Sequence, residues 1–84
     1  MQLMSVSSFI YNLMVDYLCE GKSSWPELVG AEGTVAEGTI EKENPLVDAI
    51  IVPEGTIVIT DFRCDRVWVW VNKDGIVYQV PTIG

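Results

Sequence analysis

The chain has 84 residues, of which 49% are hydrophobic and 20% charged, and its formal net charge is −7 at pH 7. A chain of this length forms one small domain with room for a single core. Positions 16 to 54 contain nine acidic residues and only two basic ones, Lys22 and Lys42, and no basic cluster occurs elsewhere. An acidic chain without a basic patch is unsuited to nucleic acid, so we interpret the acidic residues as a solvated surface.

The chain contains two cysteines, Cys19 and Cys64, and no histidine. A zinc site usually needs four Cys or His ligands, and a Ser-His or Cys-His catalytic pair needs an imidazole. We therefore expect no metal, no cofactor and no enzyme activity. The two cysteines form either one disulfide or two free thiols.

The first 18 residues are rich in apolar side chains but lack a basic start, a cleavage site and an apolar run long enough for a membrane span. A signal peptide is weakly supported and no membrane partner is expected. Helical spacing predicts an amphipathic helix from about residue 8 to 18, with Ser7 or Ser8 as its cap. The apolar stripe consists of Phe9, Ile10, Leu13, Met14, Tyr17 and Leu18. It packs on the rest of the chain, joins a second copy in a dimer, or remains a frayed extension.

A polar linker is expected from Cys19 to Ser24, followed by Trp25-Pro26, where Trp25 is a core aromatic. A helix ends at Asn44 because Pro45 pushes its predecessor out of the helical region. The helix propensity of this segment is low because it contains Gly33 and Gly38. Thr34 and Glu37 form a capping-box pattern, which would start the helix at Thr34. The helix face towards the sheet consists of Ala36 and Ile40.

A first strand is predicted over Leu46 to Val52, and a second over Val67 to Asn72. In the second strand, alternation places Val67, Val69 and Val71 in the core and Arg66, Trp68 and Trp70 on the opposite face. Asn72-Lys73-Asp74-Gly75 is a turn signal, after which Ile76 to Val80 returns as a short strand.

Between these strands the chain has β-rich side chains but also the charges of Asp61, Arg63, Asp65 and Arg66. A buried strand could not hold these charges without partners, so an exposed, extended loop is the better interpretation. Such a loop can lie in a protease cleft as a peptide substrate does.

Three motifs occur in order along the chain: Trp25 to Gly30, Asp61 to Val67, and Val80 to Gly84. Together they resemble the potato inhibitor I family of serine protease inhibitors, over Lys22 to Gly84. The resemblance implies an α+β fold of one helix on a small mixed sheet, formed by residues 22–84 behind an N-terminal extension of residues 1–21. It places the helix over Ala31 to Asn44, starting nearer Glu32, and makes the two predicted strands parallel.

The resemblance also implies a protease-binding loop at residues 55–64, with Thr60-Asp61 as the scissile bond and a serine protease as the partner. Thr60 would enter the primary pocket, and because it is small, β-branched and uncharged, it favours elastase-like or subtilisin-like enzymes over trypsin. Ile57 and Phe62 would fill flanking apolar subsites. The other loop residues are Gly55, Thr56, Val58, Ile59 and Arg63.

Inhibition by such a loop requires stiffness, so that the loop loses little entropy on binding and the cut ends stay in place for religation. In the family two arginines after the loop reach a Thr before the scissile bond and an acid after it. Here Asp61 matches the acid and Arg66 the first arginine, which predicts a charge-assisted hydrogen bond between them. Ile59 stands at the position where the family commonly has the Thr, and Trp68 stands at the position of the second arginine. Either Trp68 packs under Ile59 and restrains the loop, or the loop is loosened and inhibition is weak.

Some family members carry a disulfide in the position of Cys19 and Cys64. A bridge would suit an extracellular or vacuolar protein, and free thiols a cytosolic one. We expect a monomer, with a dimer through the N-terminal segment as the alternative. The alternative function is a non-inhibitory interaction module that uses the N-terminal segment on the same fold.

Overall fold

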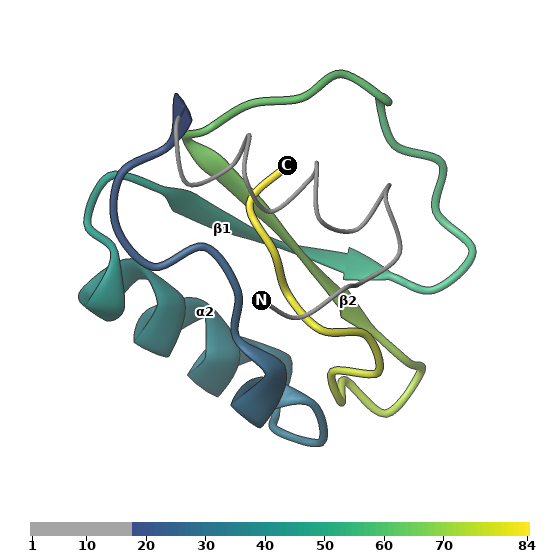
Figure 1. Cartoon of the computed structure of the whole chain (residues 1–84). Coiled ribbons are helices and arrows are strands. Elements are labelled where there is room, and N and C mark those ends of the chain that lie inside the picture. The colour runs from purple at the N-terminus through teal and green to yellow at the C-terminus, as the bar shows by residue number, and fades with distance from the viewer. Residues whose placement is uncertain (1–17) are drawn as a thin grey trace, which may run out of the picture.

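The computed structural model describes residues 18–84. In chain order the elements are the short 3-10 helix η1 (Pro26–Leu28), helix α2 (Gly33–Glu43), strand β1 (Asp48–Pro53) and strand β2 (Arg66–Val71). Figure 1 shows α2 lying against the pair of strands, with the C-terminal segment running back beside β2. The predicted α+β fold, one helix packed on a small sheet, is confirmed.

The amphipathic helix predicted for residues 8–18 lies outside the described residues, except for Leu18. Within residues 18–84 no helix is long and apolar enough to cross a membrane.

Strands β1 and β2 pair in parallel, with Ala49 opposite Val67 and Ile51 opposite Val69. The parallel pairing expected from the family resemblance is therefore present. The inward face of β2 is formed by the three buried valines Val67, Val69 and Val71, and its outward face carries Arg66, Trp68 and Trp70. The two-residue period of an extended strand produces this division, because successive side chains point to opposite faces.

The return strand predicted over Ile76 to Val80 is reduced to single antiparallel bridges, one between Val71 and Val77. The Val77 amide donates to Ala31 O, and Gly30 N donates to Val77 O, both at 2.9 Å. On its other side the segment bonds to β2 and the residue after it, because Tyr78 N donates to Trp70 O at 3.1 Å and Asn72 N donates to Ile76 O at 2.9 Å.

Helix α2 begins at Gly33, with Glu32 as its N-cap and no side-chain cap bond. The start near Glu32 is correct, and the Thr34–Glu37 capping box is wrong. Gly33 fixes the start, because its amide donates to Gly75 O at 2.8 Å and a Cβ at Gly33 would lie 2.8 Å from Val71 Cγ1. Close packing against β2 therefore overrides the local capping pattern.

The buried side chain of Asn44 ends the helix. Its Nδ2 donates to Glu20 O at 3.0 Å and Lys22 O at 2.9 Å, and its Oδ1 accepts from Leu46 N at 3.0 Å. One amide thus joins the segment before Trp25 to the helix terminus. The polar linker expected over residues 19–24 is in fact held to the body, and Ser24 also forms a bridge with Thr82.

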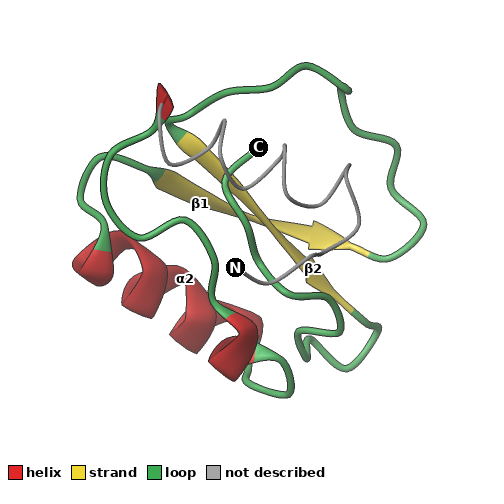
Figure 2. Cartoon of the chain, viewed as in Figure 1, coloured by secondary structure: helices red, strands yellow, loops and turns green. Residues whose placement is uncertain are grey.

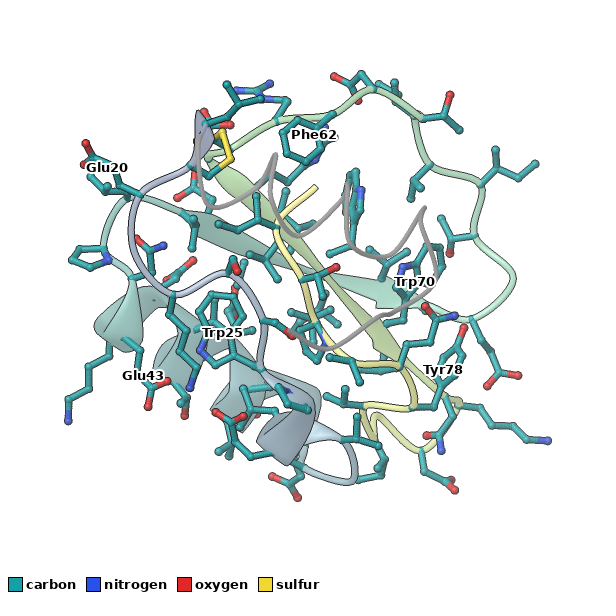
Figure 3. The ribbon with its side chains drawn as sticks, in the orientation of Figure 1. Glu20, Trp25, Glu43, Phe62, Trp70 and Tyr78 are labelled. Atoms are coloured by element: carbon teal, nitrogen blue, oxygen red, sulfur yellow. A yellow bond between two sulfur atoms is a disulfide. The ribbon has the colours of Figure 1, made fainter. Side chains whose placement is uncertain are left out.

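Trp25 is fully buried, as predicted, and its indole Nε1 donates to Glu43 Oε1 at 3.0 Å (Figure 3). Lys22 Nζ lies 2.6 Å from Glu27 Oε2, 2.9 Å from Glu43 Oε1 and 5.7 Å from the Trp25 ring centroid. Hydrogen bonds from the Lys22 ammonium lower the pKa of Glu27 and of Glu43. The same bonds raise the pKa of Lys22, and the bond to Glu27 has the larger effect. These four side chains form the tryptophan cluster, which joins the N-terminal segment to α2.

Helix α2 also protects the free edge of β1, because Glu41 Oε2 accepts a hydrogen bond from Ala49 N at 2.9 Å. The strand ends at Pro53, which has no amide hydrogen to offer.

Candidate functional site

Residues 55–64, here called the binding loop, connect the end of β1 to the start of β2. Because the strands are parallel, this connection must travel back along the whole length of the sheet before β2 can begin. Figure 2 shows it as a long arch without helix or strand, standing away from the body. Topology therefore exposes the loop in an extended form, with Thr60 and Asp61 both exposed.

The trailing arm, residues 61–64, is held first by Arg66. Arg66 Nη2 donates to Asp61 Oδ1 at 2.9 Å and to Asp61 O at 2.8 Å. The hydrogen bond predicted between these residues is present, together with a main-chain bond that was not predicted. Only 7% of Arg66 is exposed, so this cation acts from a buried and fixed position.

Arg66 is itself held from two further sides. Its Nε donates to Gly84 O at 2.8 Å, and Gly84 N donates back to Arg66 O at 2.9 Å. The guanidinium carbon lies 4.5 Å from the centroid of the Trp68 ring. The spacing of two along β2 could have suggested this stacking, because it places both side chains on one face; the contact with Gly84 had no signal in the pattern.

A second link in the trailing arm joins Arg63 to Asp65 in a bidentate pair. Arg63 Nε donates to Asp65 Oδ1 at 2.9 Å, and Nη2 to Oδ2 at 2.8 Å. These bonds lower the pKa of Asp65 and raise that of Arg63. The pair is exposed, so its effect is to orient the arm more than to stabilise the fold.

The third link is the disulfide between Cys19 and Cys64, with an S–S distance of 1.99 Å and a Cα–Cα distance of 5.1 Å. Of the two alternatives that the sequence left open, the structure contains the bridge. The yellow bond in Figure 3 marks it at the end of the trailing arm, near Phe62.

The leading arm, residues 55–60, is held much less firmly. Near its base Thr56 N donates to Pro53 O at 3.2 Å, and among the described residues no side chain of this arm takes part in a hydrogen bond or an ion pair. Ile57 is 95% exposed and Ile59 is 70% exposed. Of the two alternatives that the sequence left open for this pair, burial of Ile59 over Trp68 is not found: Ile59 is mostly exposed, and the Trp68 ring lies against Arg66.

Beneath the trailing arm is a surface hollow of about 200 Å³, lined by Asp48, Ile50, Arg63, Asp65, Arg66 and Trp68. Within the described residues no cluster of His, Cys, Asp and Glu could hold a metal ion.

The model of the Potato inhibitor I family matches residues 19–84. An inhibitor of trypsin and Hageman factor from Cucurbita maxima is 59% identical over 66 residues, covering 79% of this chain and 97% of its own. An inhibitor of Glu S. griseus protease from Momordica charantia is 58% identical, with the same coverage. The crystal structure of bitter gourd trypsin inhibitor superposes with a TM-score of 0.78 at 57% identity, covering 79% of this chain and 97% of that one. The exposed loop between parallel strands and these matches agree: the chain belongs to the potato inhibitor I family.

Proposed function

We propose that this protein inhibits a serine protease by presenting the binding loop as a substrate, with Thr60-Asp61 as the scissile bond. The observation that carries this proposal is the pair of hydrogen bonds from buried Arg66 to the side chain and carbonyl of Asp61. A residue held in this way keeps the peptide beside it in place while the rest of the extended loop enters the cleft. Membership of the family supports the same mechanism.

The loop presents apolar and uncharged groups to the protease. Ile57 and Phe62 are exposed on either side of Thr60, and the charges of Asp61 and Arg63 are already paired within the protein. Thr60 offers no cation to an acidic primary pocket and no large ring to a deep apolar one. The preferred enzymes are therefore subtilisin-like or elastase-like, whose pockets accept small or β-branched side chains.

Trypsin is the competing target, because the name of a 59% identical relative includes it. The relative that is 58% identical is named for a different protease, so similarity at this level does not carry the target from one member to another. The residue before the scissile bond contacts the primary pocket directly, and we give it more weight than overall identity.

Active-site titration of subtilisin, pancreatic elastase, chymotrypsin and trypsin tests the proposal. We expect tight inhibition of the first two and weak inhibition of trypsin. Thr60→Lys should redirect the protein towards trypsin, and Thr56→Lys, outside the primary pocket, serves as the matched control. Strong trypsin inhibition by the wild type, unchanged by Thr60→Lys, would show that the scissile bond is elsewhere.

The non-inhibitory alternative, in which the N-terminal segment is the binding element, is tested by the same titration with a chain that starts at Leu18. Equal inhibition by the full and shortened chains assigns the activity to the loop. Failure of both to inhibit any enzyme of the panel would contradict the proposed function.

A further inference from the structure

The outward face of the sheet, on the side away from α2, carries large apolar side chains that the core does not bury. Ile50 pairs with Trp68 in the parallel register, and both line the hollow beneath the trailing arm. Further along β2, Trp70 lies beside Tyr78, whose amide donates to Trp70 O (Figure 3). Ile50 is 40% exposed, Tyr78 is 41% exposed, and both tryptophans are half-buried. These four side chains, here called the apolar face, form a row along β2 of the kind that marks a binding surface.

The charged groups around the apolar face are already paired. Asp61 and Asp65, which flank it, each form an ion pair with an arginine of the protein. Helix α2, on the other side of the sheet, contains three glutamates and one lysine. An uncharged, apolar partner therefore desolvates fewer unpaired charges on the apolar face than on the surface of α2.

The N-terminal segment, residues 1–17, joins the body next to this face. Leu18 O lies 3.3 Å from Cys64 Sγ, and β2 begins two residues after Cys64. A hollow of about 300 Å³ beside Leu18 and the hollow of about 200 Å³ beneath the trailing arm share Asp65 as a wall. The N-terminal segment is therefore attached at the start of β2, one side chain away from the apolar face.

The chemistry and length of the N-terminal segment suit the apolar face. Its only charged side chain is that of Asp16. The helix predicted over residues 8–18 would be about 16 Å long. The six residues of β2 extend over about 17–20 Å, so one helix can cover both tryptophans. A segment tethered beside its site has an effective concentration of about millimolar, well above that of a second copy in dilute solution.

We propose that the N-terminal segment folds back as a helix and packs its apolar stripe on the apolar face of its own chain. Of the three arrangements that the sequence leaves open for this stripe, this one removes both apolar surfaces from water without a second molecule. The sheet is then covered on both sides, by α2 on one and by the N-terminal helix on the other. The inference stands independently of the proposed function.

NOE measurements on the full-length protein test the proposal without a variant. We expect NOEs from the methyl groups of Leu13 and Met14 to the indole rings of Trp68 and Trp70, with unchanged intensity on dilution. In a mixture of labelled and unlabelled protein these NOEs should be intramolecular. Intermolecular NOEs, together with a doubled mass in sedimentation equilibrium, would assign the face to a second copy and overturn the proposal.

Leu13→Asp should release the helix. The docked-to-free ratio should fall by about tenfold or more, because a charge replaces a side chain that is buried only in the docked form. Amide-exchange protection of residues 8–17 measures this ratio. Val15→Asp is the matched control, because it adds the same charge about 200° away around the predicted helix and should change protection much less.

Tryptophan fluorescence reports on the other side of the same contact. The chain has three tryptophans, and Trp25 is fully buried, so acrylamide reaches chiefly Trp68 and Trp70. Acrylamide should quench Leu13→Asp more strongly than wild type or Val15→Asp, while β1 and β2 keep their exchange protection in all three. Equal quenching in the three proteins, or the absence of the NOEs from wild type, would overturn the proposal and leave the proposed function standing.

Discussion

At the scale of single residues, Arg66 connects the proposed scissile bond to the rest of the protein. It donates to Asp61 on one side and to Gly84 on the other, and the Trp68 ring lies against its guanidinium. Its backbone belongs to β2, which is fixed by the buried Val67 and Val69 on either side of Trp68. Arg66 therefore transfers the rigidity of the core to the loop.

Arg66→Ala should leave the core valines packed but free Asp61. We expect the inhibition constant to rise by about ten- to a hundredfold, since a hydrogen bond to a charged group contributes roughly 1.5–3 kcal/mol. Cleavage at Thr60-Asp61 should become faster in the same variant. The inhibition constant and cleavage rate against one sensitive protease measure both effects, with circular dichroism to check folding. Lys73→Ala, which removes an exposed cation from a turn, should change neither quantity.

Trp68 should act through Arg66, because their stacking distance is 4.5 Å. Trp68→Ala should weaken inhibition by about three- to tenfold, within the range of a cation–π contact, and Trp68→Phe should recover most of the loss. NMR exchange broadening of the Arg66 Nε signal should follow the same order. Equal inhibition by wild type and Trp68→Ala would mean that Gly84 and Asp61 alone hold the guanidinium.

At the scale of elements, the patterns that depend on the core were predictable. Alternation identified the buried valines of β2, and spacing of four identified Ala36 and Ile40 in α2. The local capping pattern of Thr34 and Glu37 gave the wrong start for α2, because the amide of Gly33 is held by the distant Gly75 O. The Asp61–Arg66 bond was predictable from the family resemblance, and the spacing of two along β2 could have suggested the stacking of Trp68 on Arg66.

The tryptophan cluster predicts a pH dependence of stability. The pKa values of Glu27 and Glu43 are lowered in the folded state, so the unfolded chain binds more protons and stability falls as pH drops below about 4.5. Glu43→Gln removes the Glu43 part of this dependence but leaves an oxygen for the Trp25 indole. The difference in Tm between wild type and this variant should therefore be largest near pH 6–7 and vanish near pH 2.

The control for this comparison is Glu37→Gln, on the same helix, because Glu37 forms no ion pair with any described residue. At pH 7 its Tm difference from wild type should be smaller than that of Glu43→Gln. A Tm difference for Glu43→Gln that stays constant from pH 2 to pH 7 would show that the charge of Glu43 does not contribute to folding.

At the scale of the whole molecule, the disulfide closes a segment of 45 residues. In the chain-entropy model a closed loop of this length stabilises the fold by about 4 kcal/mol. Cys19→Ser with Cys64→Ser should therefore lower Tm by roughly 15 °C or more. Calorimetry with and without a reducing agent measures the effect, and reduced wild type should resemble the double variant. A Tm unaffected by reduction would mean that the remaining contacts of the N-terminal segment suffice.

The hydrogen bond that Glu41 accepts from the amide of Ala49 affects how this protein behaves at high concentration. An uncovered strand edge can recruit the same edge of another molecule, and repetition of that step leads to aggregates. On β1 the amide of Ala49 is occupied by Glu41, and Pro53 has no amide hydrogen, so the edge offers few donors to a second chain. The edge of β1 is therefore a poor site for pairing with another copy of the protein, while the binding loop remains exposed.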